Sequence, residues 1–249
     1  MSNPMLSERA VENFRTGESS SQVMTISGVV LKTTFLFVVL LLAASYTFSL
    51  ILSGFMDKAM MLGKVGAIGG FIVAMVIIFA RNSKILAPLS VVYAGLEGLF
   101  VGGVSAMFAK FINFEIVAQA VIATLATLLA MLFLYSSKLI RCTEKFRATI
   151  MTATLGVAVI YVVTFIMNLF NPASSSLLMG SSPIGIGFSV IVCLIAAFNL
   201  IIDFHFIETA KNMNLDKSFE WYSGFSLMVT LVWLYIEFLK LFAKLSSRD

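Results

Sequence analysis

The sequence predicts an all-α, polytopic membrane protein with seven transmembrane helices. Of its 249 residues, 59% are hydrophobic and only 12% are charged, and the mean hydropathy is +0.99. A soluble core of this size does not need so large an apolar share. Apolar stretches of about twenty residues, the length that a helix needs to cross a bilayer, recur along nearly the whole chain. They do not alternate polar and apolar residues, as the strands of a membrane barrel do.

We expect residues 1–28 to form a polar N-terminal tail and residues 29–249 to form the transmembrane domain. The tail is rich in Ser and carries mixed charge in SERAVENFRTGESSS. No cationic start leads directly into a short apolar core, so a cleavable signal peptide is not expected. The first apolar stretch would instead act as an uncleaved insertion signal, with the tail in the cytoplasm.

Seven stretches are long and apolar enough to be the spans. Each should be helical, because backbone polar groups in lipid have to be satisfied within the segment. In chain order they are Val29–Met56, Val65–Ala80, Ile85–Ala109, Ile116–Tyr135, Ala148–Phe170, Ile184–Thr209 and Tyr222–Leu245.

Glycine pairs within two of these stretches predict close helix packing. Gly66 and Gly70 stand one helical turn apart in the second stretch, and Gly98 and Gly102 do so in the third. This spacing of small residues lets the backbones of neighbouring membrane helices approach each other.

The distribution of Lys and Arg predicts the orientation. With seven spans, eleven of the 17 basic residues fall on the side of the N-terminus and six on the other side. The positive-inside rule then places the N-terminus in the cytoplasm and the C-terminus outside. Half of those six belong to the C-terminal tail, so a re-entrant last segment with both termini inside is the alternative. The net charge of +4 follows from this bias and does not indicate binding to nucleic acid.

Two carboxylates lie inside apolar stretches: Asp203 in AAFNLIIDFHFIE and Glu237 in LVWLYIEFLKLF. A lone acid in hydrocarbon is costly, so an intramembrane acid is first interpreted as a functional site. Two carboxyls close together in a low dielectric cannot both ionise cheaply, and they would share a proton and titrate in coupled steps. Loss of that proton adds negative charge, attracts a cation and could switch a gate.

Each acid also has a simpler explanation. Glu237 and Lys240 are three residues apart and could form a local ion pair, while Asp203 could lie at a solvated helix end. If the last span begins at Tyr222, Glu237 lies about 22 Å along it, in the opposite half of the membrane from Asp203. If WYSGF lies along the interface and the crossing begins near Leu227, the difference in depth falls to about 6 Å. Pairing needs this second geometry.

The residue types argue against two classes of membrane hydrolase. His205 is the only histidine, so a zinc hydrolase with several histidine ligands cannot be built from one chain, and no serine is indicated as a partner for a triad. Cys142 lies in a basic loop and Cys193 within the sixth stretch, which gives no reason to expect a disulfide. We expect no enzymatic activity and no resident cofactor.

The chain resembles the Bax inhibitor-1 (transmembrane Bax inhibitor motif) family, in its bacterial YccA-like branch. The resemblance covers nearly the whole chain and rests on NPMLSE near the N-terminus, LEGLFVGGVSAMF, FNPASSSLL, LIIDFHFIE and WLYIEFLKLF. The family's seventh-span pattern is similar to LYLDFINLF, and here Glu237 stands in place of its aspartate. The charge is kept and one methylene is added.

The resemblance implies a seven-helix bundle whose central last helix is wrapped by the other six. Members of this kind are pH-sensitive calcium leaks in which two acids share a proton, and the matching positions are Asp203 and Glu237. These two acids could also form a weak calcium site, completed by carbonyls and water because calcium takes six to eight oxygens. An arginine latches the closed state in such members, and Arg81 matches it. Their second-helix glutamate is replaced here by Gly70, and Glu97 in the third span could take over its role.

The expected function is therefore a pH-sensitive cation leak for calcium, or an ion-homeostasis protein, in the bacterial inner membrane. Calcium or protons would be the transported or regulating ions. The alternative is a regulatory membrane protein that binds a partner such as a membrane-bound protease, as some YccA-like relatives do. A proton-coupled transporter is a third, weaker alternative. The lipid bilayer is the expected environment, and the oligomeric state is open.

Overall fold

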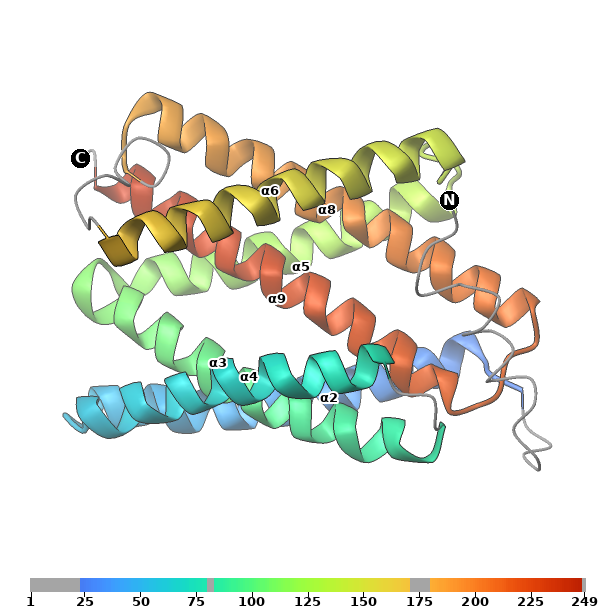
Figure 1. The fold of residues 1–249 in the computed structure, drawn as a ribbon, viewed down its shortest axis with the longest axis horizontal. Helices are drawn as coiled ribbons and strands as arrows, with labels where there is room; N and C mark the ends of the chain where they lie inside the picture. The colour runs from blue at the N-terminus through green and yellow to red at the C-terminus, as the bar shows by residue number, and fades with distance from the viewer. Residues whose placement is uncertain (1–22, 80–82, 171–179, 248–249) are drawn as a thin grey trace. The chain divides into compact units, whose positions relative to one another are not determined.

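Seven long helices and one short 3₁₀ helix make up the computed structural model over the residues that it describes, 23–79, 83–170 and 180–247 (Figure 1). All seven long helices have the length and apolarity to cross a membrane, and the described residues contain no strand. The predicted polytopic all-α fold is therefore confirmed. In chain order the elements are α2 (Ile26–Leu52), α3 (Met56–Phe79), η2 (Ser83–Ile85), α4 (Leu86–Phe111), α5 (Phe114–Ser136), α6 (Glu144–Phe170), α8 (Pro183–Asn212) and α9 (Phe219–Ser246).

The first helix begins and ends earlier than predicted, for local reasons. Thr25 caps α2, because its side-chain oxygen accepts a hydrogen bond from the backbone N–H of Gly28. The helix stops at Leu52, and Gly54 follows with a φ of 87°, a conformation that residues with a Cβ rarely adopt.

The second helix differs most from its prediction, since it begins at Met56 and not at Val65. The predicted span begins directly after Lys64, because Lys64 is the last charged residue before the apolar run. The structure includes that charged turn in the helix. Asp57 lies in the first turn, where the exposed N–H groups of a helix favour an acid, and Lys64 carries a long apolar stem.

The chain divides into two compact units, and α8 and α9 contribute to both. The first unit contains residues up to Met107 together with His205–Val229. The second contains Phe108–Phe204 and the residues from Thr230 onward. Asp203 and Glu237 thus belong to the second unit, and Glu97 belongs to the first.

Helices α2, α3 and α4 lie side by side in the first unit (Figure 1), and glycines bring α4 close to its neighbours. A Cβ at Gly98 would collide with the backbone oxygen of Leu40 on α2, and one at Gly102 with the backbone oxygen of Ala44. A Cβ at Gly66 on α3 would likewise collide with the backbone of α4. The packing role predicted for these small residues is confirmed.

Polar and aromatic contacts join the helices of the second unit. The side-chain amide of Asn199 on α8 donates to the hydroxyl oxygen of Thr154 on α6 at 2.8 Å. The rings of Tyr135 on α5 and Phe204 on α8 lie 5.9 Å apart. Helix α9 is buried or half-buried along nearly its whole length, and its exposed residues are Val229, Leu245 and Ser246. The central position of the last helix among the other six stays a prediction.

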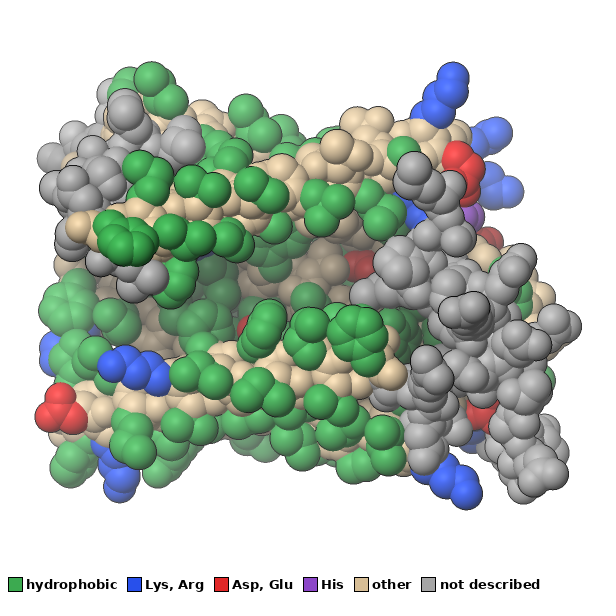
Figure 2. All heavy atoms as spheres, viewed as in Figure 1, with side chains coloured by type: hydrophobic (Ala, Val, Ile, Leu, Met, Phe, Trp, Pro, Cys, Tyr) green, Lys and Arg blue, Asp and Glu red, His purple; other side chains and the backbone are tan. Residues whose placement is uncertain are grey.

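The helices differ in how much apolar surface they expose. In the most apolar window of α2, α3, α5 and α6, between 11% and 22% of the residues are buried, against 44% in α4, α8 and α9. Figure 2 shows hydrophobic side chains along the helices, with Lys, Arg, Asp and Glu mainly at the helix ends. Apolar surface on this scale is stable against the hydrocarbon of a bilayer, and the chain is an integral membrane protein.

Candidate functional site

The carboxylate of Glu237 is held from two sides in the interior of the second unit. The side chain is 1% exposed. Its Oε1 accepts a hydrogen bond from Lys240 Nζ at 2.9 Å, one turn further along α9. Its Oε2 accepts one from the hydroxyl of Tyr161 on α6 at 2.7 Å. The ion pair of Glu237 with Lys240, which the spacing suggested as the simpler alternative, is therefore present.

Lys240 also contacts the ring of Tyr161. Its Nζ lies 4.5 Å from the ring centre, within the range of a cation–π interaction. The three side chains thus contact one another pairwise, and Tyr161 connects α6 to α9 at this level. No local sequence signal points to Tyr161, because the contact depends on how two helices pack.

A second lysine is buried one turn beyond this group. Lys244 is 8% exposed, and its Nζ donates to the backbone oxygen of Gly185 at 3.0 Å and to Ser189 Oγ at 2.8 Å. These contacts fasten the end of α9 to the first turns of α8. The thiol of Cys193, one turn after Ser189, lies close enough to Glu237 to interact electrostatically with its carboxylate. The buried acid thus has one ammonium and one phenol hydroxyl as hydrogen-bond donors, and the charge of Lys244 lies nearby on the same helix.

Asp203 lies on α8 and is buried, with 9% of its surface exposed. Trp221–Phe225, which would lie along the interface in the geometry that pairing needs, is part of the continuous helix α9, which begins at Phe219. Counted at 1.5 Å per residue, Asp203 lies about 14 Å before the end of α8 and Glu237 about 27 Å after the start of α9. The late start of α9 that would bring the acids level is absent. Sharing of a proton, and a weak calcium site between the two acids, remain predictions.

Glu97 lies on α4, directly against Gly70 of α3. A Cβ built on Gly70 would lie 3.1 Å from Glu97 Oε2. Tyr93, one turn earlier on α4, donates a hydrogen bond to the same carboxylate. The acid on α4 therefore reaches the position beside Gly70, where the pattern of the calcium leaks has its second-helix glutamate. The exchange of roles between these two positions stays a prediction.

Arg81, predicted to be a latch, lies outside the residues that the structure describes.

A further buried acid was not singled out by the sequence. Glu220, in the first turn of α9, is 1% exposed, and its Oε2 lies 2.6 Å from Lys32 Nζ of α2. Its Oε1 accepts a hydrogen bond from the backbone N–H of Thr25 at 2.8 Å. Lys32 also lies over the ring of Trp221, 5.2 Å from its centre, and any side chain at Gly28 would collide with the acid. This group fastens the start of α2 to the start of α9.

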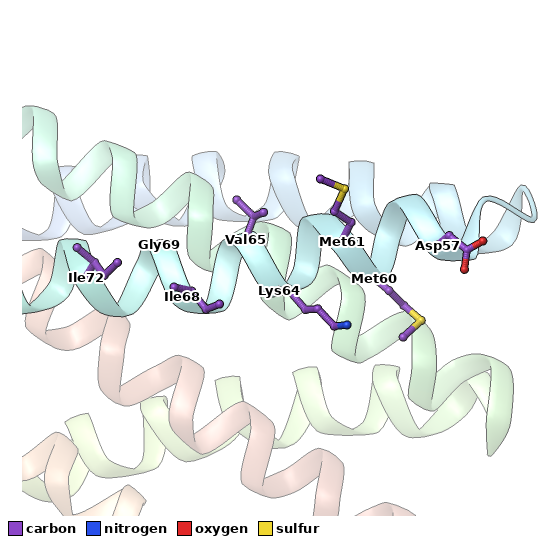
Figure 3. A pocket seen from close by; sticks show the side chains of 8 residues that line it. All are labelled: Asp57, Met60, Met61, Lys64, Val65, Ile68, Gly69 and Ile72. Atoms are coloured by element: carbon purple, nitrogen blue, oxygen red, sulfur yellow. The ribbon is translucent and has the colours of Figure 1, made fainter.

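Over the residues that the structure describes, no three His, Cys, Asp or Glu side chains come together in a way that could hold a metal ion. A groove of about 560 Å³ runs instead along α3 in the first unit. Figure 3 shows that all its labelled side chains come from this one helix and that the amine of Lys64 extends alongside Met60. The groove contains none of the predicted site residues. Its lining comprises Asp57, Met60, Met61, Lys64, Val65, Ile68, Gly69 and Ile72.

Comparison with known proteins agrees with the resemblance seen in the sequence. Residues 3–247 match the model of a family described as Bax inhibitor 1 like. No curated protein matches the chain. The match covers nearly the whole chain, and the bacterial YccA-like branch stays a prediction.

Proposed function

Because the chain belongs to the Bax inhibitor 1 like family, we propose that it is a cation leak in the membrane, with calcium as the ion, regulated by protonation of carboxyl groups inside its spans. The observation that carries the proposal is the burial of Asp203 and Glu237 within the apolar helices α8 and α9. A carboxylate at such a depth is costly unless it has charged or hydrogen-bonding partners, and intramembrane acids mark ion and proton pathways.

The arrangement around Glu237 supports this proposal if the structure is the closed state of the leak, as we propose. Both carboxylate oxygens already accept a hydrogen bond, from Lys240 and from Tyr161. A cation that used this acid would have to displace at least one of those donors. Opening is therefore proposed to separate Lys240 or Tyr161 from Glu237.

Glu97 is proposed to be an accessory acid of the leak. It lies on α4 against Gly70, so α4 supplies the carboxylate that α3 lacks at this level. Proton sharing between Asp203 and Glu237 is proposed to occur in a further conformation. The latch at Arg81 completes the proposed mechanism. The proposal assigns no catalytic reaction and no resident cofactor, and it places the chain in a bacterial inner membrane with its N-terminus in the cytoplasm.

Calcium flux into liposomes, measured across a range of pH, tests the proposal. The wild type should give a flux that changes with pH, and Asp203→Asn and Glu237→Gln should each alter its size or its pH profile. Glu115→Gln is the matched control, because Glu115 is an exposed acid in the first turn of α5. Equal flux from the wild type and both buried-acid variants would contradict the carboxylate mechanism.

A further inference from the structure

The Glu237 carboxylate has the features of a cation site, and a cation of the chain fills it. A carboxylate oxygen of Glu237 and the face of the Tyr161 ring lie against the ammonium of Lys240, and the hydroxyl of the same tyrosine donates to the other oxygen of that carboxylate. Carboxylates and aromatic faces are the groups that bind free ammonium and similar cations in proteins. The Glu237 side chain is 1% exposed, so an ion from outside reaches it only by displacing a present neighbour.

The two lysines of this region are bound in different ways. Lys244 is buried and donates to a backbone oxygen and to a hydroxyl, both on α8. Lys240 is 34% exposed in its side chain, and it contacts Glu237 and the ring of Tyr161. Lys244 is thus fixed between two helices, whereas the side chain of Lys240 is partly exposed at the surface of the protein.

We propose that Glu237 and Tyr161 form a cation-binding site that Lys240 occupies as a tethered cation, and that this occupancy excludes calcium from the site. The inference rests on the proposed function, because it assigns a regulator to the same acid. The ammonium supplies one positive charge to the carboxylate and repels a second cation that approaches. A divalent ion therefore binds only after Lys240 has moved away.

The ligand set defines the kind of ion that would replace Lys240. Glu237 offers two carboxylate oxygens and Tyr161 offers one phenol oxygen, all of them hard ligands that suit calcium. Calcium takes six to eight oxygens, so water completes the shell and binding stays weak. Lys244, close by on the same helix, adds a repulsive charge that weakens it further.

Terbium luminescence of the purified full-length chain tests this occupancy. Terbium is a luminescent substitute for calcium, and Tyr161 and Trp233, one turn before Glu237, can sensitise it at this site. Lys240→Met should bind terbium at least about tenfold more tightly than the wild type, because a unit charge a few ångströms from the ion is removed. Lys240→Arg keeps the cation and should bind as weakly as the wild type.

A double variant shows whether the gain arises at the proposed site. Lys240→Met combined with Glu237→Gln should lose the gain in terbium affinity. Equal affinity of the wild type and Lys240→Met would overturn the inference, and so would a gain that survives in the double variant. If Lys240→Met does not yield folded protein, Lys240→Gln is measured against the same criteria.

Flux and binding separate this inference from the proposed function. A terbium gain in Lys240→Met, together with no calcium flux in the wild type at any pH, would support the tethered cation and overturn the leak. Calcium flux in the wild type without any terbium gain would support the leak and overturn the tethered cation.

Discussion

Moving a half-buried carboxylate from α4 to α3 tests whether Glu97 occupies the space beside Gly70. A Cβ at Gly70 would lie 3.1 Å from Glu97 Oε2, which is tighter than an ordinary contact. The next nearest atoms, the backbone N of Glu97 and Cβ of Leu96, are both 3.9 Å away and in ordinary contact. Glu97→Ala therefore removes the close contact, and Gly70→Glu then has room for its side chain.

The magnitude follows from the charges in this space. Gly70→Glu alone brings two carboxylates together, and like charges about 4 Å apart repel by about 4 kcal/mol at an effective dielectric constant of 20. Protonation of one acid or movement of a side chain lowers this figure. Coupling between contacting residues reaches about 3 kcal/mol. We expect the double variant to be more stable than Gly70→Glu alone by at least about 2 kcal/mol.

Thermal unfolding in detergent measures this cycle of four proteins: the wild type, the two single variants and the double variant. Calcium flux in liposomes is measured on the same four. Glu97→Ala should impair the pH response of the flux, and Gly70→Glu in that background should restore part of it. If the stability changes of the single variants simply add in the double variant, Glu97 and the position beside Gly70 do not share one space, and the reasoning is refuted.

Three further predictions concern packing, charge and orientation. Lys32→Met should lower the stability in detergent by about 3 kcal/mol, because it leaves Glu220 buried without its charged partner; an unchanged melting temperature would contradict this. Gly98→Ala should destabilise by about 2 kcal/mol through backbone collision, whereas Gly95→Ala, which has open space, should not destabilise; equal effects would exclude close packing. Burial raises the pKa of Cys142, so a charged maleimide should label its thiol slowly at neutral pH and faster as the pH rises. Labelling of intact cells, without permeabilisation, would contradict a cytoplasmic position for this loop.

The number of membrane helices could be predicted from the sequence, because each helix corresponds to one apolar run of sufficient length, which is a local property. The start of α3 does not follow from it, since a helix tolerates Asp57 in its first turn and extends through Lys64. The start of α9 at Phe219 is close to the predicted Tyr222. The alternative, in which the crossing begins near Leu227, was needed only for the pairing of the two acids.

The candidate site was predictable only where its contacts are local. Glu237 and Lys240 are one turn apart on a helix, so their pair follows from spacing. Tyr161 lies on a different helix, and Glu220 and Lys32 are 188 residues apart, so only the packed structure reveals their contacts.

The central claim is that buried carboxyl groups control a cation leak, and calcium flux across pH in liposomes that contain Glu237→Gln tests it most directly. This change keeps the shape of the side chain and removes the charge that pairs with Lys240. We predict that the flux of Glu237→Gln differs from that of the wild type in size or in its pH dependence, while Glu115→Gln matches the wild type. Identical pH profiles for the wild type and Glu237→Gln would contradict the claim.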